Sequence, residues 1–205
     1  LIMEIILVVV FSYFCGSIPF GLILTKIFSN QDIREIGSGN IGATNVLRTG
    51  NKYLAFATLF LDILKGYIPV LIAKHFFPEL LQLSALLAFL GHLFPVWLKF
   101  NGGKGVATFL GILFALSYGL AALFIFTWLT VSLIFKYSSL SSIFSSLTVF
   151  IVTLITEKVT FAISPNTYEK GDLKLLLFII LILIIFTHRK NISKLKNGTE
   201  QKIKL

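Results

Sequence analysis

The sequence predicts an all-α integral membrane protein, a bundle of about seven transmembrane helices. Of the 205 residues, 56% are hydrophobic and 13% are charged, whereas a soluble domain carries about 25% charged residues. Long apolar runs recur along the whole chain, and most basic residues lie in the polar segments between them. The length suits one domain, and we expect residues 1–205 to form it.

Seven apolar runs approach the ~20 residues that a helix needs to cross a bilayer. No basic segment precedes the first run, whose only charge is Glu4, so we expect a retained span with its N-terminus outside rather than a cleaved signal peptide. The fourth and fifth runs adjoin, and Ser117-Tyr118-Gly119 offers a turn between two short helices. The predicted spans are Met3–Thr25, Tyr53–Ala73, Leu80–Leu98, Val106–Ser117, Tyr118–Phe135, Ile143–Thr160 and Leu173–Thr187.

The basic residues predict the orientation, because cytoplasmic loops carry an excess of Lys and Arg. With the N-terminus outside and the C-terminus cytoplasmic, 13 of the 18 basic residues lie on the cytoplasmic side, in residues 26–52, 99–105, 136–142 and 188–205. The opposite side holds Lys74, Lys158, Lys170 and Lys174, while Lys65 falls within a span. We therefore attribute the net charge of +9 to contact with anionic membrane lipid and expect no nucleic-acid partner.

A first polar segment, Gly37–Arg48 (GSGNIGATNVLR), combines glycines, small donors and one cation. Glycine lets the backbone turn its N–H groups toward an anion, and arginine binds two phosphate oxygens at once. We therefore predict a phosphate site with Arg48 as a catalytic cation; the alternative is a polar loop with helix caps. The predicted binding residues are Gly37, Ser38, Gly39, Asn40, Gly42, Thr44 and Asn45.

The first polar segment also matches the GxGxxG pattern of dinucleotide-binding proteins, and Asp62 follows at a suitable distance. That fold requires a preceding strand and a βαβ unit, whereas the neighbours here are apolar helices. The sequence therefore argues against a dinucleotide site.

A second polar segment, Gly91–Gly105 (GHLFPVWLKFNGGKG), ends in a Gly-Gly-Lys-Gly turn. It is not a P-loop, because Gly105 follows Lys104 where that motif requires Ser or Thr. We predict that Gly102 and Gly103 bind phosphate beside Lys104, a second catalytic cation; the alternative is Lys104 as an anchor at the membrane interface. His92 is a candidate substrate contact, with a buried structural histidine equally open, and Trp97 is expected in the interfacial aromatic belt.

Polar residues near the remaining cytoplasmic ends add candidates. Ser139 and Ser142, in the run SSLSSI, are candidate phosphate donors, although such a run also satisfies helix ends. His188 and Asn191 lie three residues apart after the last span. We predict His188 as a catalytic base or donor and Asn191 as a binding residue; a tail histidine without a role is the alternative. The predicted topology brings all these elements to one face.

The second span carries Asp62 and Lys65 on one helix face. Each costs about 2.5–3.5 kcal/mol at mid-membrane if left alone, so we expect a pair or a polar cavity. A structural pair is favoured over a role in the site. The single Cys15 lies in an apolar run, which excludes a disulfide framework and a cysteine metal site.

Four segments, GSGNIGATNVLR, GHLFPVWLKFNGGKGVAT, SSLSSI and HRKNISKLKNGTE, resemble those of the bacterial membrane glycerol-3-phosphate acyltransferases that use acyl phosphate, the PlsY family. The resemblance runs from Gly16-Ser17-Ile18-Pro19 to Glu200 and departs from the family at Thr187, where a basic residue is expected. It implies transfer of a fatty acyl group from acyl phosphate to the 1-hydroxyl of glycerol 3-phosphate. The products are lysophosphatidic acid and phosphate, in the first acylation of phospholipid biosynthesis.

The resemblance also implies a place in the cell. It implies a single acyltransferase domain that crosses the bacterial inner (cytoplasmic) membrane several times, with the active site on the cytoplasmic face. A transient contact with the enzyme that supplies acyl phosphate is expected.

The residues agree with direct acyl transfer. Acyl phosphate is an activated mixed anhydride, so we expect no cofactor and no metal site. No nucleophilic triad is evident, and the acyltransferase pattern His-x-x-x-x-Asp is absent after all three histidines. We expect direct attack by the glycerol hydroxyl, with Arg48 and Lys104 offsetting the phosphate charges. The proton goes either to His188 or to a phosphate oxygen.

Two other classes of function remain open on the sequence. A transporter for a phosphorylated metabolite also has several spans and polar loops. Transporters usually bind their substrate near the bilayer midplane between inverted repeats, and we see no internal repeat in this sequence. A scaffold protein in a lipid-synthesis complex explains the spans but not the two glycine-rich segments.

Overall fold

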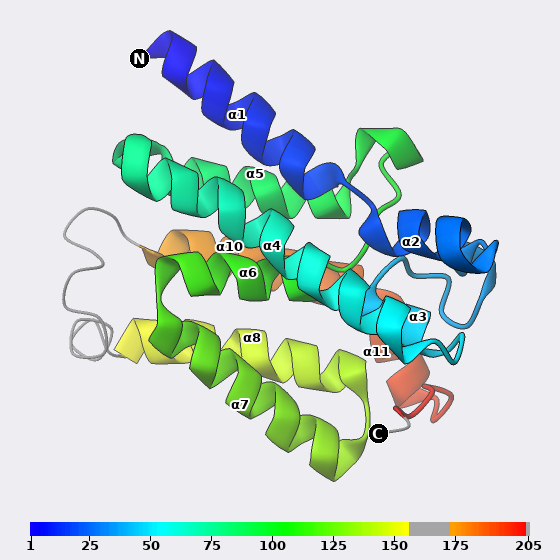
Figure 1. Cartoon of the computed structure of the whole chain (residues 1–205). Helices are drawn as coiled ribbons and strands as arrows, with labels where there is room; N and C mark the ends of the chain where they lie inside the picture. Colours follow the sequence, from blue (N-terminus) through cyan, green and yellow to red (C-terminus); the bar gives the residue numbers. More distant parts are fainter. Residues whose placement is uncertain (156–172, 204–205) are drawn as a thin grey trace. The chain divides into compact units, whose positions relative to one another are not determined.

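The computed structural model describes residues 1–155 and 173–203, and the elements in these residues are all helices (Figure 1). The chain divides into two compact units, Leu1–Ala115 and Leu116–Leu205. The first unit holds α1 (Ile2–Ser17), α2 (Phe20–Ser29), η1 (Ile33–Glu35), α3 (Ala43–Leu47), α4 (Lys52–Phe76), η2 (Pro78–Leu80), α5 (Leu81–Leu93), η3 (Val96–Leu98) and nearly all of α6 (Val106–Leu116). The second unit holds α7 (Tyr118–Phe135), α8 (Ser138–Ile155), α10 (Leu173–Thr187) and α11 (Arg189–Lys196). The single domain expected over residues 1–205 stays a prediction.

Small residues bring α1 and α5 into close contact in the first unit. A Cβ on Gly16 would collide with the backbone of Ala88, and one on Gly91 would collide with the backbone of Tyr13. In the same interface the buried hydroxyls of Ser12 and Ser84 lie 2.8 Å apart. Small residues let membrane helices approach and hydrogen-bond closely where lipid supplies no hydrophobic driving force.

The first predicted span, Met3–Thr25, contains a bend that we did not predict. The helix α1 ends at Ser17, α2 begins at Phe20, and the two are bent by 40° relative to one another. Ile18 is extended, because the ring of Pro19 disfavours helical backbone at the residue before it. Pro19 was therefore the signal in the sequence for this bend.

Four helical segments among the described residues are long and apolar enough to cross a membrane: α4, Pro78–Leu98, α7 and α8. Counting each of the bent pairs α1/α2 and α10/α11 as one span raises the number to six. The fourth predicted span, α6, has 11 residues and is about 16 Å long, against about 30 Å for the hydrocarbon core. The count of seven spans and the orientation of the termini stay predictions. The predicted end of the sixth span, residues 156–160, lies outside the described residues, as do Lys158 and Lys170.

The predicted break between the fourth and fifth apolar runs is confirmed. The helix α6 ends at Leu116, and Ser117 is extended and caps α7 by accepting a hydrogen bond from the Leu120 amide. A serine with this backbone is a favoured start for a helix.

In the second unit α8 packs against both α7 and α10. It begins at Ser138, so the serine run predicted to precede the sixth span is helical. Ser141, Ser142 and Ser145 each donate to the carbonyl four residues earlier. This internal pairing lets serines with poor helix propensity continue an apolar helix.

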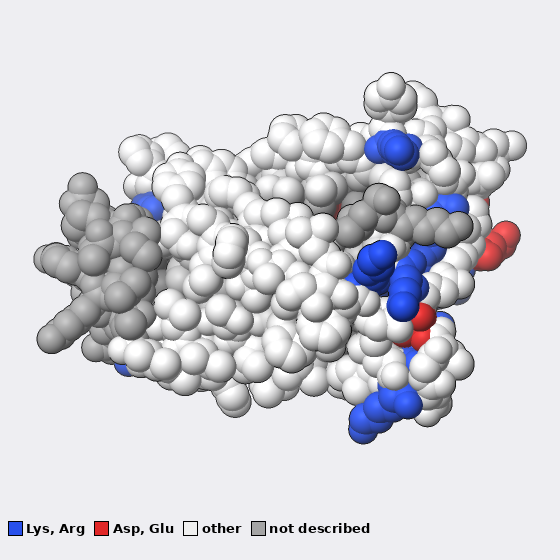
Figure 2. Space-filling model, turned by 90° about the horizontal axis from the view of Figure 1, so that it is seen from below, with Lys and Arg blue, Asp and Glu red and all other residues white. Residues whose placement is uncertain are grey.

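The surface is apolar where that of a soluble protein would be polar. Phe56 and Phe60 on α4 are 70% and 51% exposed, and Phe126 and Leu133 on α7 are 71% and 64% exposed. Figure 2 shows wide areas of the face in view without a charged side chain. Exposed apolar surface of this extent calls for lipid as the solvent, so the protein is an integral membrane protein.

Candidate active site

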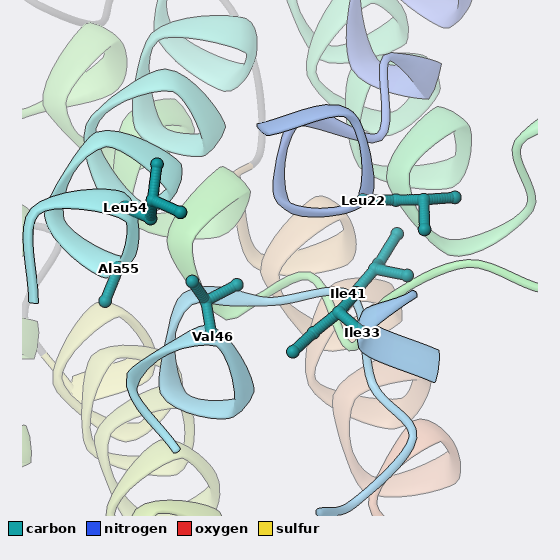
Figure 3. Packing of buried hydrophobic residues seen from close by; sticks show 6 residues of the cluster. All are labelled: Leu22, Ile33, Ile41, Val46, Leu54 and Ala55. Carbon is teal, nitrogen blue, oxygen red and sulfur yellow. The ribbon is translucent and has the colours of Figure 1, made fainter. Parts of the chain in front are cut away.

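The first polar segment, Gly37–Arg48, rests on a small hydrophobic core within the first unit (Figure 3). Ile41 and Val46 belong to the segment and are buried in this cluster. The other members are Leu22 of α2, Ile33 of η1, and Leu54 and Ala55 of α4. The apolar residues of the segment thus anchor it to the neighbouring helices, while residues 37–39 stay exposed.

Asn45 organises the backbone of the segment from inside. Its buried side chain donates through Nδ2 to the carbonyl oxygens of Ile33, Ile36 and Asn40 at 3.0, 2.9 and 2.8 Å. Its Oδ1 accepts from the Ser38 amide at 2.9 Å. One carboxamide thus holds the chain on both sides of Gly37, and its predicted contact with phosphate stays a prediction.

Gly37, Ser38 and Gly39 form the exposed tip of the segment. Gly37 has φ +55° and Gly39 has φ +70°, a backbone conformation that other residues rarely adopt. A Cβ on Gly37 would also lie 2.6 Å from Asn45 Oδ1. The tip therefore requires glycine at these two positions. The amides of Ser38 and Gly39 donate to Asn45 Oδ1 and to the Ile36 carbonyl at 2.9 and 3.0 Å.

The remaining predicted residues of the segment lie at its base. Asn40 Oδ1 accepts from the Gly42 amide at 2.9 Å, which fixes the turn before α3. Thr44 lies half-buried in α3. These residues shape the loop, and their direct contact with a substrate stays a prediction.

Arg48 supplies a positive charge beside the tip. Its side chain is exposed, and Nη1 donates to Asn45 Oδ1 at 3.3 Å. Asp32, which precedes the segment, is paired with two cations, since its Oδ2 lies 2.6 Å from Arg34 Nη2 and 3.6 Å from Lys26 Nζ. The hydrogen bonds from Arg34 hold the pKa of the Asp32 carboxyl well below its usual range. The loop therefore offers a phosphate an exposed cation and an acid whose charge is balanced.

The second polar segment folds back onto the end of α5. The amides of Gly102 and Gly103 donate to the carbonyls of Leu93 and His92 at 3.0 and 3.1 Å. Lys104 is half-buried between the buried Gly103 and Gly105, two residues before the start of α6. The turn that carries the predicted second cation is thus tied to the helix before it and leads directly into the helix after it.

His92 lies beneath this turn. The side chain is buried, and a Cβ on Gly103 would collide with His92 Nε2. A direct contact between His92 and a substrate stays a prediction. Trp97 is 59% exposed, as an interfacial aromatic residue should be, and its Nε1 donates to Ser17 Oγ at 2.8 Å.

In the second unit, the end of α10 orients the ring of His188. The side chain is buried, and Nδ1 lies 2.8 Å from the Ile184 carbonyl oxygen. Because a carbonyl oxygen can only accept, Nδ1 carries a proton in this contact. A general base acting through Nε2 requires this arrangement at Nδ1.

Glu200 is a residue of this unit to which the sequence analysis assigned no role. Its Oε1 accepts from Asn191 Nδ2 at 2.6 Å and from Ser139 Oγ at 3.1 Å. It thereby joins the tail after α11 to the first turn of α8. The signal in the sequence was a lone acidic residue in a strongly basic tail, which a buried donor pair can explain.

Ser142 pairs differently. It donates to the Ser138 carbonyl at 2.8 Å and accepts from Trp128 Nε1 at 3.2 Å. The contacts predicted between substrate and Ser139, Ser142, His188 and Asn191 stay predictions. In the part of the chain that the structure describes, no group of three or more His, Cys, Asp or Glu side chains is placed to hold a metal ion.

The family profile described as glycerol-3-phosphate acyltransferase matches residues 6–198. The chain belongs to this family. The acyltransferase is 50% identical to a protein of Pelagibacter ubique (strain HTCC1062) named glycerol-3-phosphate acyltransferase, over 99% of this chain and 100% of that protein. It is 51% identical to a protein of the same name from Mesorhizobium japonicum, over 97% of this chain and 95% of that protein.

Two crystal structures of the integral membrane glycerol 3-phosphate acyltransferase PlsY (YgiH) resemble this acyltransferase. The glycerol 3-phosphate form has a TM-score of 0.87 and 37% identity, over 98% of this chain and 96% of that chain. The lysophosphatidic acid form has a TM-score of 0.83 and 36% identity, over 97% and 95%. These likenesses confirm the predicted family, the all-helical membrane fold and the enzyme class, and they favour the enzyme over the transporter and scaffold alternatives.

Proposed function

We propose that this acyltransferase transfers a fatty acyl group from acyl phosphate to the 1-hydroxyl of glycerol 3-phosphate, giving lysophosphatidic acid and inorganic phosphate. The observation that carries the proposal is the pair of crystal structures of PlsY, which align with this chain at 37% and 36% identity. One is named for glycerol 3-phosphate and the other for lysophosphatidic acid, which are the acceptor and the product of this reaction.

Acyl phosphate as the donor is supported by the two glycine-and-cation elements of the first unit. One is the exposed tip Gly37–Gly39 with Arg48, and the other is the turn that carries Lys104. A reaction in which both substrates carry a phosphate uses two such elements. An acyl thioester has no phosphate next to its reacting carbon and would leave one of them without a role.

The proposed reaction is a direct displacement. The 1-hydroxyl oxygen attacks the acyl carbonyl carbon, the bond from that carbon to the phosphate oxygen breaks, and phosphate leaves with the electron pair. Arg48 and Lys104 stabilise the charge on the phosphates. The hydroxyl proton passes either to His188 Nε2 or to an oxygen of the departing phosphate, and no acyl-enzyme intermediate forms.

The proposed reaction takes place at the cytoplasmic face of the bacterial inner membrane. Glycerol 3-phosphate is water-soluble, whereas the acyl chain of the donor partitions into lipid. The proposal is supported by the basic residues, which gather in the segments predicted to be cytoplasmic. A transient contact with the enzyme that supplies acyl phosphate fits this placement.

Purified protein in lipid vesicles tests the proposal. With acyl phosphate and glycerol 3-phosphate we expect one phosphate released for each lysophosphatidic acid formed. Comparable turnover with acyl-CoA would contradict acyl phosphate as the donor. Uptake of labelled glycerol 3-phosphate into sealed vesicles without acylation would instead support a transporter.

A further inference from the structure

Two charged residues of α4 are buried together inside the first unit. The side chains of Asp62 and Lys65 are 3% and 2% exposed, and Asp62 Oδ1 lies 2.8 Å from Lys65 Nζ. Replacing a buried ion pair by apolar residues of similar volume is often neutral or stabilising. Stability alone therefore does not explain why this apolar helix carries an ion pair. The contacts of each side chain with other parts of the chain indicate another role.

Lys65 reaches the bend between α1 and α2. Its Nζ donates to the Ile18 carbonyl oxygen at 2.6 Å, where the chain turns by 40°. The following helix α2 leads into the first polar segment and packs against it. A Cβ on Gly21 would collide with the Ile41 carbonyl, and Leu22 lies in the same core as Ile41 (Figure 3). Lys65 is thus linked through α2 to the loop that carries Arg48.

Asp62 faces the second polar segment. Its Oδ1 lies 4.0 Å from His92 Nδ1, on the neighbouring helix α5. Both side chains are buried, and His92 Nδ1 makes no hydrogen bond to another described residue. The other side of the ring supports Gly103, whose amide donates to the His92 carbonyl at 3.1 Å. Asp62 thus lies beside the ring of His92 without a hydrogen bond to it, and the ring contacts the turn that carries Lys104.

We infer that Asp62, Lys65 and His92 are positioning residues that set the separation between the loop of Arg48 and the turn of Lys104. The inference rests on the proposed function, in which these two elements hold the phosphates of the two substrates. The three residues act through the Ile18 carbonyl and the Gly103 backbone, and they do not touch the reacting atoms. His92 was predicted above as a candidate substrate contact. In this inference it instead packs beneath Gly103 and positions the turn.

A spacing role has a kinetic signature that a stabilising role lacks. Each phosphate element keeps its own donors when the buried cluster changes, so the KM for each substrate should change little. The reaction requires both substrates at the correct separation, and an error of about 1 Å can cost about 100-fold in rate. Loss of the cluster should therefore lower kcat.

The double variant Asp62→Asn/Lys65→Met tests this, because it removes the link to Ile18 without leaving an unpaired buried charge. We expect the parent's midpoint of thermal unfolding in detergent to be kept within a few degrees. We expect kcat to fall about tenfold to 100-fold, with KM for glycerol 3-phosphate changed less than threefold. A matched control is Ser12→Ala/Ser84→Ala, which removes another buried polar pair of the same unit and should leave kcat unchanged.

His92→Gln supplies a second measurement that does not depend on folding of the double variant. It keeps a polar side chain and removes the ring beneath Gly103, and the same loss of kcat is expected. Combining His92→Gln with Asp62→Asn/Lys65→Met should add little further loss, because both act on one separation. Parental kcat in well-folded His92→Gln, or in the double variant, would overturn the inference. A parent protein that does not use acyl phosphate would overturn the proposed function instead, since the parent is assayed first.

Discussion

Asn45 Oδ1 accepts hydrogen bonds from the Ser38 amide at 2.9 Å and from Arg48 Nη1 at 3.3 Å. A single buried oxygen therefore sets the distance between the exposed glycine tip and its cation. Because Nδ2 of the same side chain shares its two hydrogens among three carbonyls, the tip cannot shift without weakening hydrogen bonds of a buried side chain, which are worth about 0.5–1.5 kcal/mol each.

The first prediction compares two glycines with the same backbone requirement. Gly37 and Gly50 have φ +55° and +86°, so alanine at either position is strained by about 1–2 kcal/mol. At Gly37 the new Cβ also meets Asn45 Oδ1 and Arg48 Cδ, whereas at Gly50 it meets nothing within 4 Å. Gly37→Ala should raise KM for glycerol 3-phosphate about tenfold or more, while Gly50→Ala should lower only the unfolding temperature. Equal kinetics in the two variants would show that the tip does not bind substrate.

The second prediction concerns Arg48. Its planar guanidinium can hold two phosphate oxygens, a geometry that lysine does not reproduce. Arg48→Lys should lose about 30- to 1000-fold in kcat/KM, corresponding to about 2–4 kcal/mol, while the protein still inserts and folds. Near-normal acyl transfer by well-folded Arg48→Ala would make this segment a structured loop without a catalytic cation.

The third prediction concerns Lys104, which acts as a point charge rather than a fork. Lys104→Ala should lose nearly all activity. Lys104→Arg should keep part of it, because the charge remains although the flanking glycines are buried and leave limited space. The ratio of the two kcat/KM values measures the contribution of charge separately from that of shape. If Lys104→Ala and Lys104→Arg were equally active, the charge would have no role.

The fourth prediction concerns Glu200 and its two donors. Glu200→Gln keeps an acceptor oxygen for Asn191 and Ser139 and should retain most of the activity. Glu200→Ala leaves both donors unsatisfied, at about 1–3 kcal/mol each, and should lower both the unfolding temperature and kcat. Thermal unfolding in detergent and the acyl-transfer assay check the pair. Equal behaviour of the two variants would mean that the tail is held by other contacts.

The fifth prediction concerns topology. In a protein without Cys15, single cysteines at the exposed positions Glu35, Asn101 and Asn197 should react with an impermeant maleimide only from the cytoplasmic side. A cysteine at the exposed His75 should react only from outside. Labelling of positions 75 and 101 from the same side would contradict the predicted orientation.

Composition and motif were enough to predict the helical membrane fold and the family, and Ser117 was enough to predict the break before α7. The bend at Pro19 was missed because the residues on both sides of it are apolar, so hydropathy alone indicates one continuous span. The serine run of α8 was placed before the helix because serine is ambiguous between capping a helix and donating to its carbonyls.

The residue types of the candidate site could be predicted from the sequence, but the direction in which each side chain points could not. Asn40, Thr44 and Asn45 look alike in the sequence, and only the packing of Ile41 and Val46 turns Asn45 into the interior. The hydrogen bond between Glu200 and Ser139 joins residues far apart along the chain. Such a pairing follows from the tertiary structure, which a single sequence does not contain.

At the start of the short helix α6 the chain changes abruptly from polar to apolar. Gly105 ends the turn that carries Lys104, and Val106 begins a helix whose 11 residues include no charged side chain. The turn that carries the proposed second cation and an apolar helix thus meet at a single peptide bond. The proposed donor has a similar arrangement, in which a charged phosphate is joined through an acyl carbonyl to an alkyl chain. The polar turn and the apolar helix that follows it therefore match the polar head and the apolar chain of the donor that we propose.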